Sequence, residues 1–315
     1  MPSPDLTVYT IGQHSADDCR AVLASLRDQT VASQLEVLVV APSLGDVARE
    51  EFDCFHRFDL VPFDPVEDCG TTGAAAVRAA TAPFVTYAEE HAFFEANWAE
   101  ELIAAHRRGY DVVGCAMKNA NPRSATSWAH LYAQFGPVVH PTESRKSDFL
   151  AGHHVSYRRD LLLAYGGDLR TVLEDESALF LELRSRGVPL YIEGKAISYH
   201  VNLSTLSGFG TLEFVGMRSF ASSRAELGKW PLWRRLAFAV AIPLVPCLRV
   251  ARISRDMRRS GRLRMLPSIL PSLLPALACG ALGEATGYLF GPGRSAQLKT
   301  PIELQRHDFV AGKDR

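Results

Sequence analysis

The stretch FVTYAEEHAFFEANW, from Phe84 to Trp98, joins a strand-like run to an unusual ending. The extended spacing of apolar and hydroxyl residues up to Tyr87 predicts a β-strand. Two carboxylates and an imidazole, Glu89, Glu90 and His91, follow almost at once. Ligands of α/β sheets bind beyond the carboxyl ends of the strands. These side chains therefore either hold a metal ion at a functional edge or form a solvated turn beside a core histidine.

Strand and helix patterns alternate on both sides of this stretch. Apolar runs predict strands at 6–12, 35–42, 83–90 and 110–117, with a weaker one at 53–63. Other patterns predict helices at 15–30, 70–82 and 95–109, the first with Ser15 as its N-cap. This alternation predicts an α/β fold with a mostly parallel, Rossmann-like sheet flanked by helices. A chain of 315 residues is long enough for one large domain and an appendage.

Composition and charge narrow the class of protein. Lys and Arg number 34 against 35 Asp and Glu, so the chain gives no reason to expect a nucleic-acid partner. Six scattered cysteines without a CxxC pair predict free thiols in a reducing compartment. The N-terminal MPSPDLTVYTIG lacks the basic and apolar segments of a secretory signal, so we expect the catalytic part to remain in the cytosol.

Four segments of the chain resemble motifs of the family-2 glycosyltransferases with the GT-A fold, and they follow one another in the family's order over roughly residues 5–205. Residues 6–43 look like the family's first strand, a helix ending in SLxxQT and its nucleotide-side second strand. Residues 73–91 are similar to the segment carrying the family's Asp-x-Asp motif, whose place Glu89-Glu90-His91 takes. Residues 149–169 resemble the acceptor side. Residues 175–200 resemble the segment with a Glu-Asp pair and a late histidine, here Asp175-Glu176 and His200.

The resemblance implies a donor side built from the first strand and the acidic stretch. A divalent cation, Mn²⁺ or Mg²⁺, would bridge the diphosphate of a nucleotide-sugar donor and stabilise the charge on the leaving phosphate. Because Mn²⁺ accepts imidazole as well as oxygen ligands, we expect Glu89, His91 and His200 to hold the cation, with Glu90 facing the ribose or sugar. The remaining donor-side residues are Thr10, Ile11 and Gly12.

The acceptor side follows from the same resemblance. A Glu-Asp-His version of the acidic motif, with a Trp seven residues after the His, belongs to a bacterial subgroup of the family, and Trp98 stands seven residues after His91. The residues expected on the acceptor side are His153, His154, Arg158 and Trp98. For the two histidines and the arginine, an ordinary surface or helix-cap role is the alternative.

An acceptor hydroxyl must lose its proton as it attacks the sugar, and a carboxylate within hydrogen-bond reach can take it. By position in the family's motif, Glu176 is expected to be this general base, with Asp175 and Glu174 as alternatives if the alignment slips by a residue. A single base without a second, nucleophilic carboxylate fits inversion at the anomeric carbon, as the resemblance also implies. The cluster LEDES is alternatively an acidic helix N-terminus.

Two departures from the family's pattern leave other functions open. Ala41 and Pro42 stand where the family commonly has an Asp-Asp pair that contacts the nucleotide. Gly73 and Ala74 stand in the place of an Arg-Asn pair. The alternatives are a catalytically inactive GT-A scaffold that binds another glycosyltransferase, and a nucleotidyltransferase with a similar metal–phosphate site.

The C-terminal third has a different composition. Residues 236–248 and 265–283 carry no charge and flank a run rich in arginine, while Trp230 and Trp233 precede the first apolar segment. We expect interfacial or re-entrant helices on the anionic cytoplasmic face of the cell membrane. A helical tail packed on the catalytic domain and a two-pass hairpin are the alternatives. The predicted organisation is a GT-A domain at 1–206, a membrane-associated helical region at 207–295 and a polar tail at 296–315.

These features together predict a metal-dependent, inverting glycosyltransferase. It would transfer a sugar to a lipid-linked or polysaccharide acceptor in envelope or exopolysaccharide assembly. The lipid-linked acceptor is expected because membrane-associated helices would keep the enzyme close to such a substrate.

Overall fold

The computed structural model describes residues 3–66, 68–174 and 176–314. Contacts divide the chain into two compact units. The first, the α/β unit, contains the chain up to Lys118 together with His140–His200. The second, the helical unit, contains Asn119–Val139 and the chain from Val201 onward.

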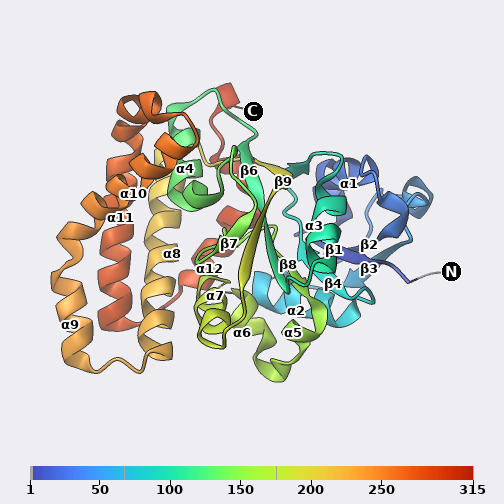
Figure 1. Cartoon of the computed structure of the whole chain (residues 1–315), viewed down its shortest axis with the longest axis horizontal. Coiled ribbons are helices and arrows are strands. Elements are labelled where there is room, and N and C mark those ends of the chain that lie inside the picture. The colour runs from blue at the N-terminus through green and yellow to red at the C-terminus, as the bar shows by residue number, and fades with distance from the viewer. Residues whose placement is uncertain (1–2, 67, 175, 315) are drawn as a thin grey trace. The chain divides into compact units, whose positions relative to one another are not determined.

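A nine-stranded sheet forms the centre of the α/β unit, in the order β3-β2-β1-β4-β8-β6-β9-β5, with β7 paired to β9 (Figure 1). Strands β1 to β4 are mutually parallel, whereas the pairs β4–β8, β6–β8, β5–β9 and β7–β9 are antiparallel. The strands are β1 (Leu6–Ile11), β2 (Leu35–Ala41), β3 (Arg57–Pro62), β4 (Phe84–Tyr87), β5 (Ala92–Phe94), β6 (Val112–Asn119), β7 (Arg145–Ser147), β8 (Ser156–Arg158) and β9 (Leu190–His200).

Six helices belong to this unit: α1 (Arg20–Arg27), α2 (Cys69–Ala79), α3 (Trp98–Arg107), α5 (Arg159–Leu163), α6 (Leu169–Glu174) and α7 (Glu176–Ser185). Ser15 is an N-cap as predicted, although the turn that it caps, Ala16–Cys19, is a 3₁₀ turn ahead of α1. The Asp68 side chain caps α2 by accepting a hydrogen bond from the Thr71 N–H. These caps satisfy amide groups that a helix start leaves without an intrahelical partner.

The core explains the sequence pattern of the first two strands. Every residue of β1 and of β2 is buried. Strands buried on both faces read as continuous apolar runs, which is why both were visible in the sequence. The α/β fold prediction is confirmed, and the strands predicted at 53–63, 83–90 and 110–117 are β3, β4 and β6.

The helical unit consists of α4 (Ala125–Phe135), α8 (Leu206–Leu227), α9 (Leu232–Val240), α10 (Val245–Arg259), α11 (Leu266–Phe290) and α12 (Ser295–Leu304). Helices α8 and α11 pack closely because glycines line the contact. A Cβ at Gly283 would lie 2.1 Å from the Phe214 carbonyl oxygen, and one at Gly287 would lie 2.3 Å from that of Arg218. Helix α11 also continues through Pro271 and Pro275.

Among the described residues, one segment of the helical unit is long and apolar enough to cross a membrane. It is Leu263–Phe290, with a mean hydropathy of 1.7 and 33% of its most apolar window buried. Leu232–Val240 and Ile242–Arg259 pass the same criterion only as a pair, bent by 44°. Core helices of soluble proteins share these properties, so the segments do not by themselves define a membrane span.

Candidate metal centre

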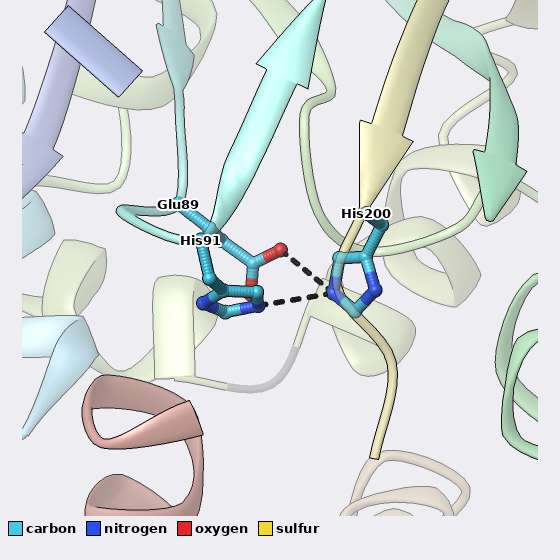
Figure 2. A group of neighbouring side chains, drawn as sticks. All are labelled: Glu89, His91 and His200. Atoms are coloured by element: carbon cyan, nitrogen blue, oxygen red, sulfur yellow. Dashed lines mark hydrogen bonds and ion pairs between the residues drawn. The ribbon is translucent and has the colours of Figure 1, made fainter. Parts of the chain in front are cut away.

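Three side chains predicted as metal ligands meet beyond the carboxyl end of β4 (Figure 2). Glu89 and His91 lie between β4 and β5, and His200 ends β9. Because β5 pairs with β9 so that Ala92 stands opposite His200, the strand register brings His91 beside it. His91 Nε2 lies 3.1 Å from His200 Nε2, and Glu89 Oε2 lies 3.2 Å from His200 Nε2.

The chemistry of this trio fits a divalent transition metal. All three side chains are at most 1% exposed, and their ligand atoms lie within 4.8 Å of one another. Two imidazole nitrogens facing each other share at most one proton, so lone pairs and a carboxylate converge on one point. One oxygen and two nitrogen ligands suit Mn²⁺ or a similar transition metal, whereas Mg²⁺ favours an all-oxygen set.

Electrostatics keep Glu89 ionised despite its burial. Burial acts to raise the pKa of this carboxyl. The charges of His153, His91 and His200 and the contact with His154 outweigh burial, and they hold the pKa of Glu89 well below its usual range. The centre therefore presents an anionic oxygen at its middle.

Glu90 orients one of the ligands. Its Oε1 lies 2.8 Å from His91 Nδ1, and its side chain is 6% exposed. Donation from Nδ1–H to the carboxylate leaves the lone pair of His91 on Nε2, which faces His200 and Glu89. A metal-binding histidine held by a carboxylate on its other nitrogen is a common arrangement. The structure thus places Glu90 against His91, whereas the sequence prediction had it face the ribose or sugar.

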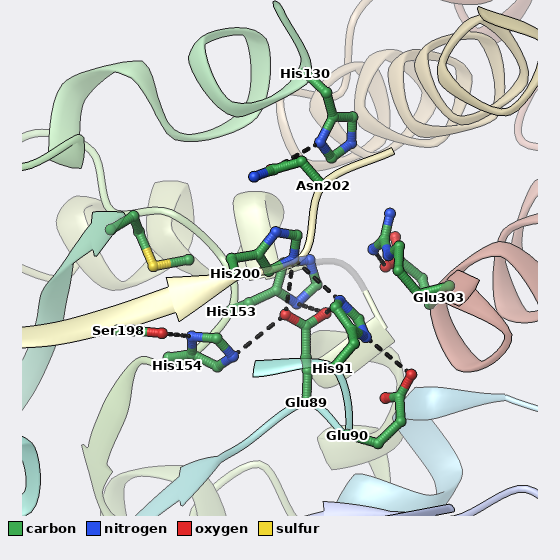
Figure 3. Close-up of polar contacts among 12 residues, drawn as sticks. Glu89, Glu90, His91, His130, His153, His154, Ser198, His200, Asn202 and Glu303 are labelled. Atoms are coloured by element: carbon green, nitrogen blue, oxygen red, sulfur yellow. Dashed lines mark hydrogen bonds and ion pairs between the residues drawn. The ribbon is translucent and has the colours of Figure 1, made fainter. Parts of the chain in front are cut away.

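Two further histidines lie beside Glu89 (Figure 3). His153 Nδ1 lies 3.3 Å from Glu89 Oε1, and His154 Nε2 lies 3.3 Å from Glu89 Oε2. The other nitrogen of His154, Nδ1, lies 2.7 Å from Ser198 Oγ. His153 is the member of this group with an appreciably solvent-exposed side chain, at 23%. Both histidines, predicted on the acceptor side, lie beside the carboxylate of Glu89 in the candidate metal centre.

The acids of the LEDES cluster have separate roles. Glu176, at the start of α7, accepts a hydrogen bond of 2.9 Å from Tyr157 Oη. Its Oε2 lies 2.9 Å from where a Cβ on Gly152 would stand, next in the chain to His153. Glu174 Oε2 instead accepts from the Gly70 N–H at 2.8 Å, so this acid caps α2. Asp175 lies outside the described residues.

Tyr157 acts as a permanent hydrogen-bond donor to Glu176. Its burial and the neighbouring Glu176 charge raise the pKa of the Tyr157 hydroxyl well above its usual value. The phenol therefore keeps its proton at neutral pH and donates it to the carboxylate. Neither Tyr157 nor Ser198 was singled out from the sequence. For Ser198 the available signal was the alternation along β9, which puts it on the same face as His200.

Other predicted residues have different surroundings. Arg158 forms ion pairs with Asp111 and Asp160 at 2.8 and 2.6 Å on the surface. Trp98 is fully buried and stacks on Phe94, with ring centroids 4.0 Å apart. Thr10 and Ile11 are buried in β1, and a Cβ at Gly12 would lie 2.2 Å from the Ser15 carbonyl oxygen. Gly12 therefore allows the tight turn that follows β1.

Comparison with known proteins supports the fold. No protein-family model and no curated protein matches this chain. Among solved structures, the chain is similar to the mannosyltransferase PcManGT from Pyrobaculum calidifontis in complex with GDP-Man and Mn²⁺. The TM-score is 0.54 at 15% identity, over 87% of this chain and 88% of that one. It also matches S. aureus TarS 1-349, with a TM-score of 0.47 at 14% identity over 90% of both chains. The chain thus has the α/β fold of a GT-A-like protein, as predicted.

Proposed function

We propose that this protein is a metal-dependent glycosyltransferase that uses a nucleotide-sugar donor. The observation that carries the proposal is the buried Glu89–His91–His200 group beyond the carboxyl end of β4. It stands in a fold shared with a mannosyltransferase whose structure contains GDP-Man and Mn²⁺. Family-2 membership, with Glu89-Glu90-His91 as a variant of Asp-x-Asp, belongs to the same proposal.

In this proposal Glu89, His91 and His200 hold a divalent cation, Mn²⁺ in preference to Mg²⁺. When bound, such a cation neutralises the charge that grows on the leaving diphosphate. Glu90 keeps His91 in the tautomer whose Nε2 lone pair faces the centre. The β1 end at Thr10–Gly12 is the proposed donor side, where it contributes backbone in preference to side chains because Thr10 and Ile11 are buried.

Glu176 is the proposed general base. It would accept the proton of the acceptor hydroxyl as that oxygen bonds to the anomeric carbon and the bond to the diphosphate breaks, which inverts the anomeric centre. The hydrogen bond from Tyr157 fixes the orientation of the Glu176 carboxylate. Glu174 is a weaker alternative because it already caps α2.

We propose a lipid-linked or polysaccharide acceptor, in envelope or exopolysaccharide assembly, and attachment to the cytoplasmic face of the membrane. The support is a stripe on the helical unit. Its large apolar side chains stand four residues apart and are 47–79% exposed: Leu232, Leu236, Val240, Leu244 and Leu248. Exposed arginines follow on α10, at 252, 255, 258 and 259, and Asp256 is the one acidic residue in 227–283. Such a surface suits an anionic bilayer interface.

The catalytic proposal is tested by thermal unfolding with a panel of nucleotide sugars, with Mn²⁺ or with a chelator. Metal and the correct donor together are expected to stabilise the protein by roughly 2–3 kcal/mol at a hundredfold excess over the dissociation constant. His91→Ala is expected to remove this joint effect. Equal stabilisation in chelator would contradict the metal site. Tight donor binding without transfer would indicate an inactive scaffold, and release of pyrophosphate a nucleotidyltransferase.

The membrane proposal has its own test with vesicles. Arg→Glu at 255, 258 and 259 is expected to weaken binding to anionic vesicles by about 1 kcal/mol per arginine, with a smaller effect at high salt. Binding that no salt reverses and that needs detergent in every variant would indicate insertion through the bilayer. Absence of vesicle binding by the wild type would overturn the membrane proposal and leave the catalytic one standing.

A further inference from the structure

His154 has a left-handed backbone conformation. Its φ is 59°, in the left-handed region that side chains with a Cβ seldom occupy, and the residue is fully buried. Within the described part of the chain, one other non-glycine residue, Lys229 at 47°, shares this feature. Lys229 directly follows a helix end, where left-handed residues are common. His154 lies in a turn ahead of β8.

The His154 ring is fixed by its contacts (Figure 3). Ser198 Oγ lies 2.7 Å from Nδ1, and the ring meets Phe94 edge-on at a centroid distance of 5.4 Å. If the serine hydroxyl donates to Nδ1, the proton of the neutral ring is on Nε2, which lies 3.3 Å from Glu89 Oε2. The ring then carries an N–H that faces the Glu89 carboxylate at ion-pair distance, outside hydrogen-bond geometry.

Four imidazole nitrogens face the two carboxylate oxygens of Glu89. Its Oε1 faces His91 at 3.6 Å and His153 at 3.3 Å, while Oε2 faces His154 and His200. A carboxylate between several nitrogens can rotate, and rotation would change which oxygen meets a cation. Residues that hold a ligand from outside the coordination sphere tune metal affinity, commonly by 10–100-fold.

We infer that His154 is a positioning residue that holds Glu89 ready for the cation, with Ser198 fixing the tautomer of the ring. This inference rests on the proposed metal centre. The strained backbone at residue 154 is then retained because it brings Nε2 to the carboxylate. The side chains grouped with Glu89 as possible metal ligands in the described residues do not include His154, so His154 acts on a ligand and is not assigned as one.

Two substitutions separate this role from a structural one. In His154→Gln, the side-chain amide can reach the position of Nε2 and still donate to Glu89. In His154→Asn, the amide reaches only the position of Nδ1, near Ser198, but asparagine tolerates a left-handed backbone better than glutamine. A positioning role therefore predicts that Gln is the better replacement for metal binding. A purely structural role predicts that Asn is at least as good.

The measurement is titration of the full-length protein with Mn²⁺ alone, following the free ion by electron paramagnetic resonance. We expect affinity within about threefold of wild type for His154→Gln, and a loss of about 10–100-fold for His154→Asn and about tenfold for Ser198→Ala. His106→Gln is the matched control, since His106 is also buried and also contacts a serine, at 2.7 Å from Ser156 Oγ. Its Mn²⁺ affinity is expected to be unchanged.

The outcomes distinguish the inference from the function on which it rests. Wild-type Mn²⁺ binding with an unchanged affinity in His154→Asn would overturn the positioning role alone. A wild type that binds no Mn²⁺ would overturn both. Melting temperatures of the metal-free variants are recorded alongside, and an affinity loss that merely follows the loss of stability across the set would also count against the inference.

Discussion

A buried carboxylate lies at each end of the parallel strands, and the two carboxylates have different kinds of partner. At the amino end, the second residue of β2, Glu36, has no side-chain exposure. It accepts hydrogen bonds from the Thr7 hydroxyl, from both the N–H and hydroxyl of Thr81, and from Arg57. At the carboxyl end, Glu89 is equally buried. In the described part of the α/β unit, its ion pairs are all with histidines.

The two carboxylates differ in whether their partners can lose protons and bind a cation. Burial acts to raise the pKa of each carboxyl, and the partners outweigh it, so the pKa of Glu36 and that of Glu89 are both lowered. Hydroxyl, amide and guanidinium groups keep their protons at neutral pH, so Glu36 is permanently satisfied. Imidazoles can lose theirs and offer lone pairs to a cation. The partners at the amino end therefore stabilise the fold, whereas those at the carboxyl end are able to accept a cation.

The largest effect expected at the carboxyl end is on catalysis. Glu176→Gln keeps the shape of the side chain and a group that accepts from Tyr157, but it cannot take a proton at neutral pH. Sugar transfer is expected to fall about 10²–10⁴-fold, while donor and Mn²⁺ binding remain near wild type. The measurement is the single-turnover rate with the donor identified by the thermal panel.

Glu174→Gln is the matched control for this substitution. Glu174 accepts from the Gly70 N–H, so its change is expected to affect stability slightly and transfer little. Should Asp175→Asn be the severe change and Glu176→Gln the mild one, the role passes to Asp175. If none of the three slows an established reaction, the cluster is only a helix N-terminus.

His106 differs from the histidines around Glu89, and this difference predicts that the protein loses stability in acid. His106 donates from Nδ1 to the Tyr110 carbonyl and accepts from Ser156, so its neutral form is fully satisfied. Burial lowers the pKa of His106 from 6.5 to about 4, partly opposed by the bond to Tyr110. Because the unfolded chain takes up this proton first, the stability that neutral His106 contributes is lost as pH falls from 6.5 to about 4. The loss is about 3 kcal/mol.

Urea unfolding at pH 7 and at pH 4 measures this loss, and His106→Gln isolates it from other titrating groups. The variant is expected to be less stable than wild type at pH 7 but to lose about 3 kcal/mol less on acidification. An identical acid loss in both proteins would show that His106 does not carry the effect.

The sequence predicted the parallel half of the sheet and the elements around it. β1 and β2 were visible because every residue in them is buried. The family resemblance predicted that three side chains lie together, namely Glu89, His91 and His200. The pairing register of β5 with β9 brings them into contact. Glu36 was overlooked, although one acid within an apolar run is itself a sign of a buried network.

The remaining features depend on contacts that local patterns do not encode. β7 and β8 have three residues each, too few for a periodicity to be recognised, and their antiparallel pairing joins distant segments. Helix α4 was not predicted from the sequence, and nothing in its own residues reveals that it packs with the C-terminal helices α10 and α11. The left-handed backbone of His154 is likewise invisible in a sequence, since histidine does not require it.

The smallest effect tests the comparison itself, with one substitution made at each end of the sheet. Glu36→Gln turns an amide N–H toward donors that no longer have an anionic partner. It is expected to lower the free energy of unfolding by about 2 kcal/mol, the scale of a lost charged hydrogen bond. Stabilisation by Mn²⁺ should remain.

Glu89→Gln removes a buried charge that metal-free histidines neutralise incompletely at pH 8. The metal-free protein is therefore expected to keep or gain stability, and stabilisation by Mn²⁺ to disappear. Urea unfolding of both variants, with and without Mn²⁺, gives the four values. If Glu89→Gln destabilises the metal-free protein as much as Glu36→Gln does, the histidines around Glu89 form a structural network like the one at the amino end, and the assignment of this edge to a ligand is wrong.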